Sequence, residues 1–104
     1  MFNKIKYKII GTELRMKERN KPKHTYIILT LKPINNRENI MNQLDISVDL
    51  ENLKKITRDK KVKEIINYLL KLGESDYNNW ERISGEMFQI VHKELYHKTI
   101  SLSF

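Results

Sequence analysis

Five basic residues stand at every second position within one short stretch of the chain. They are Arg15, Lys17, Arg19, Lys21 and Lys23. A second set with the same spacing precedes them and comprises Lys4, Lys6 and Lys8. Alternate residues of an extended strand share one face, so this spacing can produce a row of positive charge. Such a row binds the phosphates of a polyanion and releases their counterions.

The positive charge is concentrated in the first third of the sequence. Residues 1–34 contain nine lysine or arginine residues and two glutamates, a balance of +7, whereas residues 35–104 contain eleven of each sign. Segregated charge is typical of a phosphate-binding surface. The alternative is a solvated basic surface with no partner, because charge on a small protein is also uneven by chance.

The two kinds of basic side chain suit different contacts with duplex DNA. Arginine enters a narrow, A·T-rich minor groove, where the potential is strongly negative, so Arg15 and Arg19 are the candidates for insertion. Lys17, Lys21 and Lys23 would hold the backbone. We therefore expect double-stranded DNA as the partner, with A·T-rich sites favoured.

Gln89 and Lys93 are further candidates for contacts with DNA. Glutamine can pair with adenine, and lysine can reach guanine or phosphate. Both would lie on a recognition helix if residues 77–95 formed a helix-turn-helix with its turn at Ser84-Gly85. The apolar spacing from Trp80 onward is also that of one unbroken core helix, so both interpretations are open.

The sequence offers no arrangement suited to catalysis. It contains no cysteine, and its histidines are His24, His92 and His97. The last two are five residues apart, which is not the spacing of a metal-binding pair on a helix. With three glycines in the chain, no phosphate-cradling loop can be assembled. We predict no enzymatic activity, no metal site and no cofactor.

Two extended segments carry the basic residues. Residues 3–16 alternate between polar and apolar, and the alternation changes parity after Gly11, which predicts a β-bulge. Residues 24–33 are rich in β-branched side chains and end at Pro33. The pattern predicts an antiparallel hairpin with a basic tip.

The remainder of the chain is predominantly helical. Residues 44–48 alternate, which is compatible with a third strand, and Asp49 is placed to cap a helix. Apolar residues recur at helical spacing within 49–95, and residues 97–104 alternate as a final strand. The sequence predicts one α+β domain, 1–104, in which the basic hairpin of residues 1–34 and the last strand form a small antiparallel sheet against two or three helices.

The stretches RMKERNKPK and NNWERISGEMF carry a loose family resemblance. The chain resembles small winged helix-turn-helix DNA-binding proteins, among them the accessory proteins that bind the transfer origin of clostridial conjugative plasmids. The resemblance implies a winged-helix-like fold, binding to double-stranded DNA and a homodimer. The chain departs from that family in one respect. Its basic hairpin precedes the helices, whereas the wing of a winged helix follows the recognition helix.

Composition places the protein in a broad class. The absence of cysteine and of a long apolar run predicts a cytoplasmic protein without a membrane partner. Abundant lysine, isoleucine and asparagine, with no alanine, indicate an AT-rich source, and we expect a plasmid or phage gene. The alternative functions are a small inhibitor from a mobile element that binds a host protein, and an RNA-binding domain.

Overall fold

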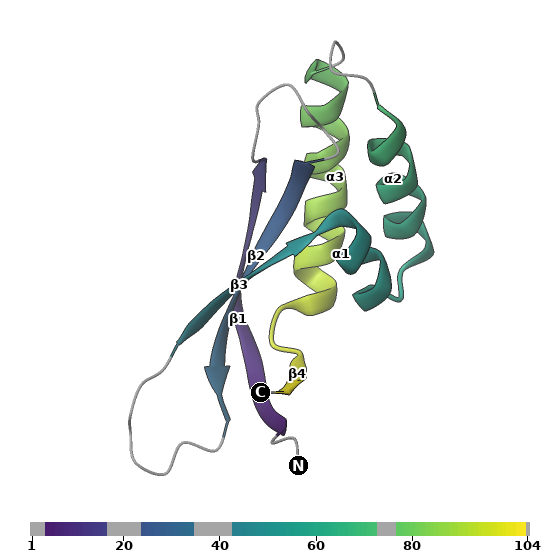
Figure 1. The fold of residues 1–104 in the computed structure, drawn as a ribbon. Coiled ribbons are helices and arrows are strands. Elements are labelled where there is room, and N and C mark those ends of the chain that lie inside the picture. The colour runs from purple at the N-terminus through teal and green to yellow at the C-terminus, as the bar shows by residue number, and fades with distance from the viewer. Residues whose placement is uncertain (1–3, 17–23, 35–42, 73–76, 104) are drawn as a thin grey trace.

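The computed structural model describes residues 4–16, 24–34, 43–72 and 77–103. Within these ranges four strands and three helices follow the order β1, β2, β3, α1, α2, α3, β4 (Figure 1). Their bounds are β1 Lys4–Met16, β2 Thr25–Pro33, β3 Leu44–Asp49, α1 Leu50–Ile56, α2 Lys60–Lys71, α3 Tyr77–Leu95 and β4 Thr99–Ser103. The predicted α+β class and the predicted element order are confirmed, and the arrangement is compatible with a small winged-helix-like domain.

The four strands form one antiparallel sheet in the order β3, β2, β1, β4. β1 and β2 are the predicted hairpin, in which Met16 lies opposite Thr25. β4 returns from the helices and pairs with the other side of β1, where Ile5 lies opposite Leu102. The last strand therefore joins the sheet of the hairpin, as the sequence predicts, and brings the C-terminal end beside the basic residues of β1.

The pairing of β1 with β2 shifts by one residue between Ile9 and Gly11, which confirms the predicted bulge. Ile9 is fully buried before the shift, and Leu14 and Met16 are half-buried after it. Gly11 permits a close approach of β1 to β2, because a Cβ at this position would lie 3.3 Å from the Cβ of Thr30 and crowd it. The bulge thus keeps the apolar side chains of the long strand on one face of the sheet.

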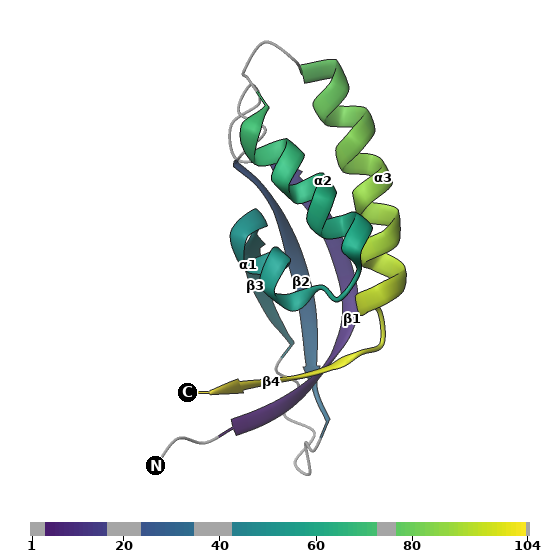
Figure 2. The ribbon, with the colours of Figure 1, turned by 90° about the vertical axis from the view of Figure 1, so that its right-hand side faces the viewer.

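The helices cover one face of the sheet, which we call the inner face (Figures 1 and 2). Ile27, Leu29 and Leu31 alternate along β2 and are fully buried there. The helices bury Leu53, Ile66 and Met87, among others, in the same core. The opposite, outer face of the sheet has no covering layer in the described part of the chain. Burial of one face only explains the alternation of polar and apolar residues in the strands.

Aspartate side chains start the first two helices. An oxygen of Asp49 accepts a hydrogen bond from the backbone N–H of Asn52, at 2.8 Å, which confirms the predicted cap of α1. Asp59 caps α2 in the same way through the N–H of Val62, at 3.1 Å. Each carboxylate satisfies a backbone donor that the first turn of a helix leaves without a partner.

The third helix is continuous. Trp80, Ser84, Met87, Val91 and Leu95 are buried and recur three and four residues apart along α3. Because Ser84 is part of this buried face, the chain does not turn at Ser84-Gly85. The interpretation of residues 77–95 as a helix-turn-helix with its turn there is therefore wrong, since these residues form one core helix.

Trp80 connects α3 to the hairpin. Its indole Nε1–H donates a hydrogen bond to the hydroxyl oxygen of Thr25 at the start of β2, at 2.5 Å, and both residues are buried. A buried tryptophan usually has such a partner. Trp80 therefore begins the apolar face of a core helix, as its spacing in the sequence indicates.

Replacing Gly85 by alanine is expected to stabilise the protein by about 1 kcal/mol, the usual difference between these residues inside a helix. A Cβ at Gly85 would have no atom within 4 Å beyond the backbone of its own helix, so the substitution introduces no clash. Urea denaturation of both proteins measures the change. Gly11→Ala is the control and should give no such gain, because its Cβ would crowd Thr30. A loss of stability in Gly85→Ala would contradict the prediction.

Candidate nucleic-acid interface

The structure describes the basic residues of the strands. The side chains of Lys6, Lys8 and Arg15 are exposed on β1, and Lys4 begins that strand opposite Ser103. Four other predicted DNA contacts lie outside the described residues: Lys17, Arg19, Lys21 and Lys23. The part of the candidate interface that the structure describes therefore lies on the sheet.

Three exposed lysines come together at one end of the outer face. Lys8 of β1 lies directly opposite Lys32 of β2, and Lys6 stands two residues before Lys8. We call Lys6, Lys8 and Lys32 the lysine cluster. Like charges directly opposite each other on neighbouring strands are destabilising. In the described part of the chain none of the three lysines has an acidic partner in an ion pair, so the repulsion is not offset there.

Hydroxyl side chains of the last strand flank the lysine cluster. Thr99 lies opposite Lys8 and Ser101 lies opposite Lys6 in the pairing of β1 with β4, and both are exposed. Amines and hydroxyls are the side-chain donors that bind phosphate oxygens in nucleic-acid complexes. Lys6 and Lys8 are separated by about 6.8 Å, the repeat of two residues in a strand. This end of the outer face therefore combines hydrogen-bond donors with positive charge.

Arg15 occupies a different part of the same strand. Its guanidinium forms an ion pair with the carboxylate of Glu13, at 2.9 Å, and both side chains are more than half exposed. An exposed ion pair is worth about 0–1 kcal/mol, so it does not prevent Arg15 from binding elsewhere. Asp45 and Asp49 of β3 are exposed on this sheet as well. The positive charge thus belongs to one end of the outer face and not to all of it.

Gln89 and Lys93 are not part of this surface. Both are exposed on α3, but α3 lies with the other helices against the inner face of the sheet (Figure 1). The structure therefore does not bring these two predicted contacts to the lysine cluster.

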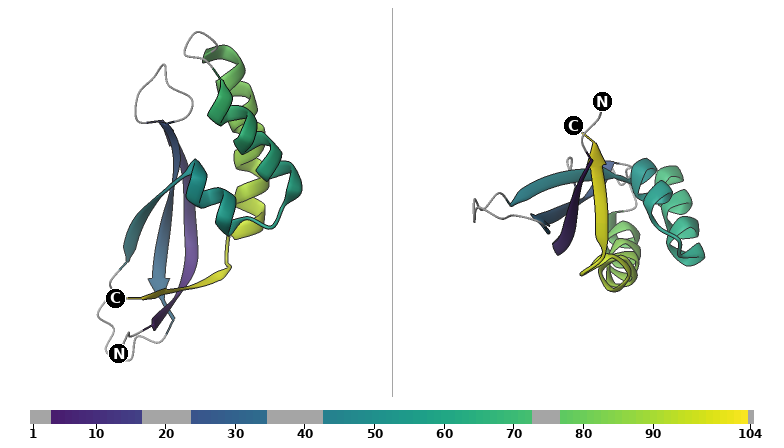
Figure 3. Two further views of the ribbon diagram at one scale, coloured as in Figure 1. Left: turned by 45° about the vertical axis from the view of Figure 1, so that its right-hand side comes forward. Right: turned by 90° about the horizontal axis from the view of Figure 1, so that it is seen from below.

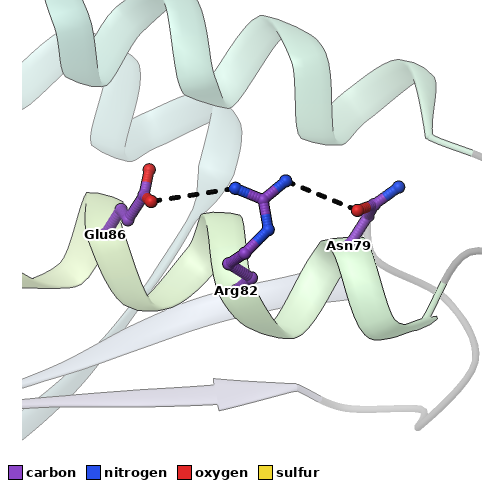
Figure 4. Close-up of polar contacts among 3 residues, drawn as sticks. All are labelled: Asn79, Arg82 and Glu86. Carbon is purple, nitrogen blue, oxygen red and sulfur yellow. Dashed lines mark hydrogen bonds and ion pairs between the residues drawn. The ribbon is translucent and has the colours of Figure 1, made fainter.

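The exposed side of α3 carries its own polar contacts. Arg82 lies between Asn79 and Glu86, with its guanidinium nitrogens 3.4 Å and 3.8 Å from their respective oxygens (Figure 4). Next to Glu86 a shallow hollow of about 260 Å³ between α2 and α3 is lined by Ile65, Tyr68 and Ile83, among others. Its apolar walls, and charged lining residues that are one lysine and two glutamates, make it unlike the lysine cluster.

His92 and His97 lie near the C-terminal end of α3. The Nδ1 atom of His92 is 2.6 Å from the hydroxyl of Thr12 in β1, and its ring stacks on Tyr96 with the centroids 4.9 Å apart. His97 has a positive φ of 68° where the chain leaves α3, a conformation that helices commonly adopt at their C-terminal end. In the described ranges no three histidine or acidic side chains converge as metal ligands.

Sequence reasoning missed Lys32, Thr99 and Ser101 as members of the site. Lys32 is more than twenty residues from Lys6 and Lys8 in the sequence, and only the register of the hairpin places it beside Lys8. The alternation of Thr99 and Ser101 with apolar residues in the last strand was a usable signal. Their position beside Lys6 and Lys8 required the pairing of β4 with β1.

Comparison of the chain with protein-family models, with curated proteins and with solved structures gives no match. In the described part of the chain each helix is too short or too polar to cross a membrane. The charges and geometry of the sheet are therefore the features that bear on function.

Proposed function

We propose that the protein binds double-stranded DNA through the lysine cluster on the outer face of its sheet. The observation that carries the proposal is the direct opposition of Lys8 and Lys32, with Lys6 nearby and without acidic partners in the described residues. This arrangement costs folding energy when the protein is alone. A phosphate backbone would remove the repulsion, because each lysine that meets a phosphate also releases a counterion.

The side chains of the outer face are suited to contacts with the DNA backbone more than to recognition of bases. Its donors are lysine amines and the hydroxyls of Thr99 and Ser101, which bind phosphates without regard to sequence. Any preference for A·T-rich duplex would come from groove shape, or from the basic residues that the sequence places between the first two strands. In this proposal, the phosphate contacts of the sheet supply affinity for the duplex and orient the protein on it.

Titration of the protein into a labelled A·T-rich duplex tests the proposal. Affinity should fall between about 50 mM and about 200 mM salt, with a slope of log K against log salt of about −3 or steeper for three lysine contacts. The single strand of the same sequence serves as the comparison and should bind more weakly. Absence of duplex binding at the lower salt concentration contradicts the proposal, and a preference for the single strand would favour RNA or single-stranded DNA as the partner.

The double substitution Gln89→Ala/Lys93→Ala gives the control for the location of the interface. These side chains lie on the helical layer, so their removal should change duplex affinity by less than about twofold and leave its salt slope within about one unit. A large loss of affinity would move the interface from the sheet to α3.

A further inference from the structure

A second concentration of positive charge lies where α1 is joined to α2. Residues 54–63 contain six basic residues and one aspartate, and Asp59 is occupied as the cap of α2. Five of the six basic side chains are exposed and Lys54 is half-buried. Three lysines stand in the first turn of α2, where the helix dipole disfavours positive charge. Stability of the helix does not explain this set of lysines.

A groove beside this charge leads toward the last strand. It has a volume of about 270 Å³, and its walls include Arg58, Lys98 and Thr99. Glu94 also lines it, but its two carboxylate oxygens accept hydrogen bonds from the Thr57 hydroxyl and the Arg58 backbone N–H. Arg58 and Lys98, both exposed, outnumber Glu94 among the charged residues of the groove, which is therefore positive overall.

The groove adjoins the lysine cluster across β4. Thr99, which lines the groove, lies opposite Lys8 in the sheet. The backbone oxygen of Lys98 also accepts a hydrogen bond from the N–H of Ile9, at 2.8 Å, next to Lys8. From below, β4 is seen between β1 on one side and the helices α1 and α2 on the other (Figure 3). One end of the molecule thus has positive charge on both flanks of a single strand.

We infer that duplex DNA docks on this end of the molecule and contacts both flanks of β4. One phosphate backbone would lie on the lysine cluster and the other beside Arg58 and Lys98. A duplex supplies two backbones separated by a groove, whereas a single strand supplies one. The inference rests on the proposed function and extends it, because it gives the interface a second half that faces the helices.

The double variant Arg58→Ala/Lys98→Ala tests the second flank. We expect duplex affinity to fall about tenfold at low salt and the salt slope to become shallower by about two, one unit for each lost phosphate contact. Binding to the single strand of the same sequence should change by less than about twofold. Lys71→Ala/Lys93→Ala removes the same charge from exposed sites on α2 and α3, and should leave duplex binding and its slope nearly unchanged. An unchanged slope in Arg58→Ala/Lys98→Ala overturns the inference while the proposed function stands.

A measurement on the wild-type protein without DNA separates the two claims. Inorganic pyrophosphate is titrated into labelled protein and followed by two-dimensional NMR. The Arg58 side-chain N–H and the Lys98 amide signals should shift, while that of Lys71 stays in place. If they shift although the protein binds no duplex, the flank is an anion site, and both the proposed function and the docking of duplex on this flank fail. If they do not shift, the inference is overturned whatever the duplex titration shows.

Discussion

Replacing Lys8 by glutamate is expected to stabilise the fold and to weaken duplex binding at the same time. The substitution places a carboxylate opposite Lys32 and exchanges a repulsive cross-strand pair for an attractive one. The gain should be about 0.5–1 kcal/mol at low salt. Duplex affinity should fall at least about tenfold, because a phosphate contact is lost and a repulsive charge takes its place. Thermal unfolding and duplex titration on the same preparation measure the two effects.

The double variant Lys8→Glu/Lys32→Glu tests the physical reason. It restores a pair of like charges, now both negative, so the gain in stability should disappear. Duplex affinity should fall further, by about a hundredfold relative to wild type. Lys71→Glu makes the same change of charge on the exposed side of α2 and should reduce binding far less. Parallel loss of binding in all three variants would show that net charge, and not the lysine cluster, governs affinity.

Replacing Glu94 by alanine is expected to cause the largest loss of stability among the substitutions considered, about 2–4 kcal/mol. The Glu94 carboxylate of α3 accepts hydrogen bonds from the Thr57 hydroxyl, at 2.5 Å, and from the Arg58 backbone N–H, at 2.8 Å. Thr57 is only 2% exposed, so its hydroxyl proton would lose its acceptor in a place that water barely reaches. The melting temperature should fall by roughly 10–20 °C.

Two controls assign that loss to the hydrogen bonds. Glu94→Gln keeps one acceptor oxygen and the shape of the side chain, so it should lose about half as much stability. Glu81→Ala removes an exposed carboxylate from the same helix and should change stability by less than about 0.5 kcal/mol. Equal losses in Glu81→Ala and Glu94→Ala would show that helix α3 simply needs acidic residues, and would contradict the role given to Glu94.

Local patterns in the sequence predicted most of the fold. Alternation along residues 3–16 predicted the long strand, and the change of parity after Gly11 predicted its bulge, because each side chain of a strand must face either core or solvent. Asp49 marked the start of α1, since a short oxygen-bearing side chain satisfies the first free N–H groups of a helix. These features depend on neighbours within a few residues.

The same reasoning failed where a local pattern had two solutions. Ser84-Gly85 was compatible with a turn and with a helix interior, and the packing of Trp80 and Met87 in one core decided for the helix. No local pattern marked Glu94 as a structural residue, because its partner Thr57 is distant in sequence. Propensity near a glycine is weak, and tertiary burial overrides it.

The sequence by itself determined the alternating basic strand, its bulge, the order of strands and helices and the excess of positive charge in the first third. Tertiary structure alone decided that Lys32 lies beside Lys8, that Thr99 and Ser101 flank the lysines, and that Arg58 and Lys98 line a groove on the far side of β4. The reason is physical: periodicity fixes which face a side chain occupies, whereas strand register and the packing of helices on the sheet fix which distant side chains become its neighbours.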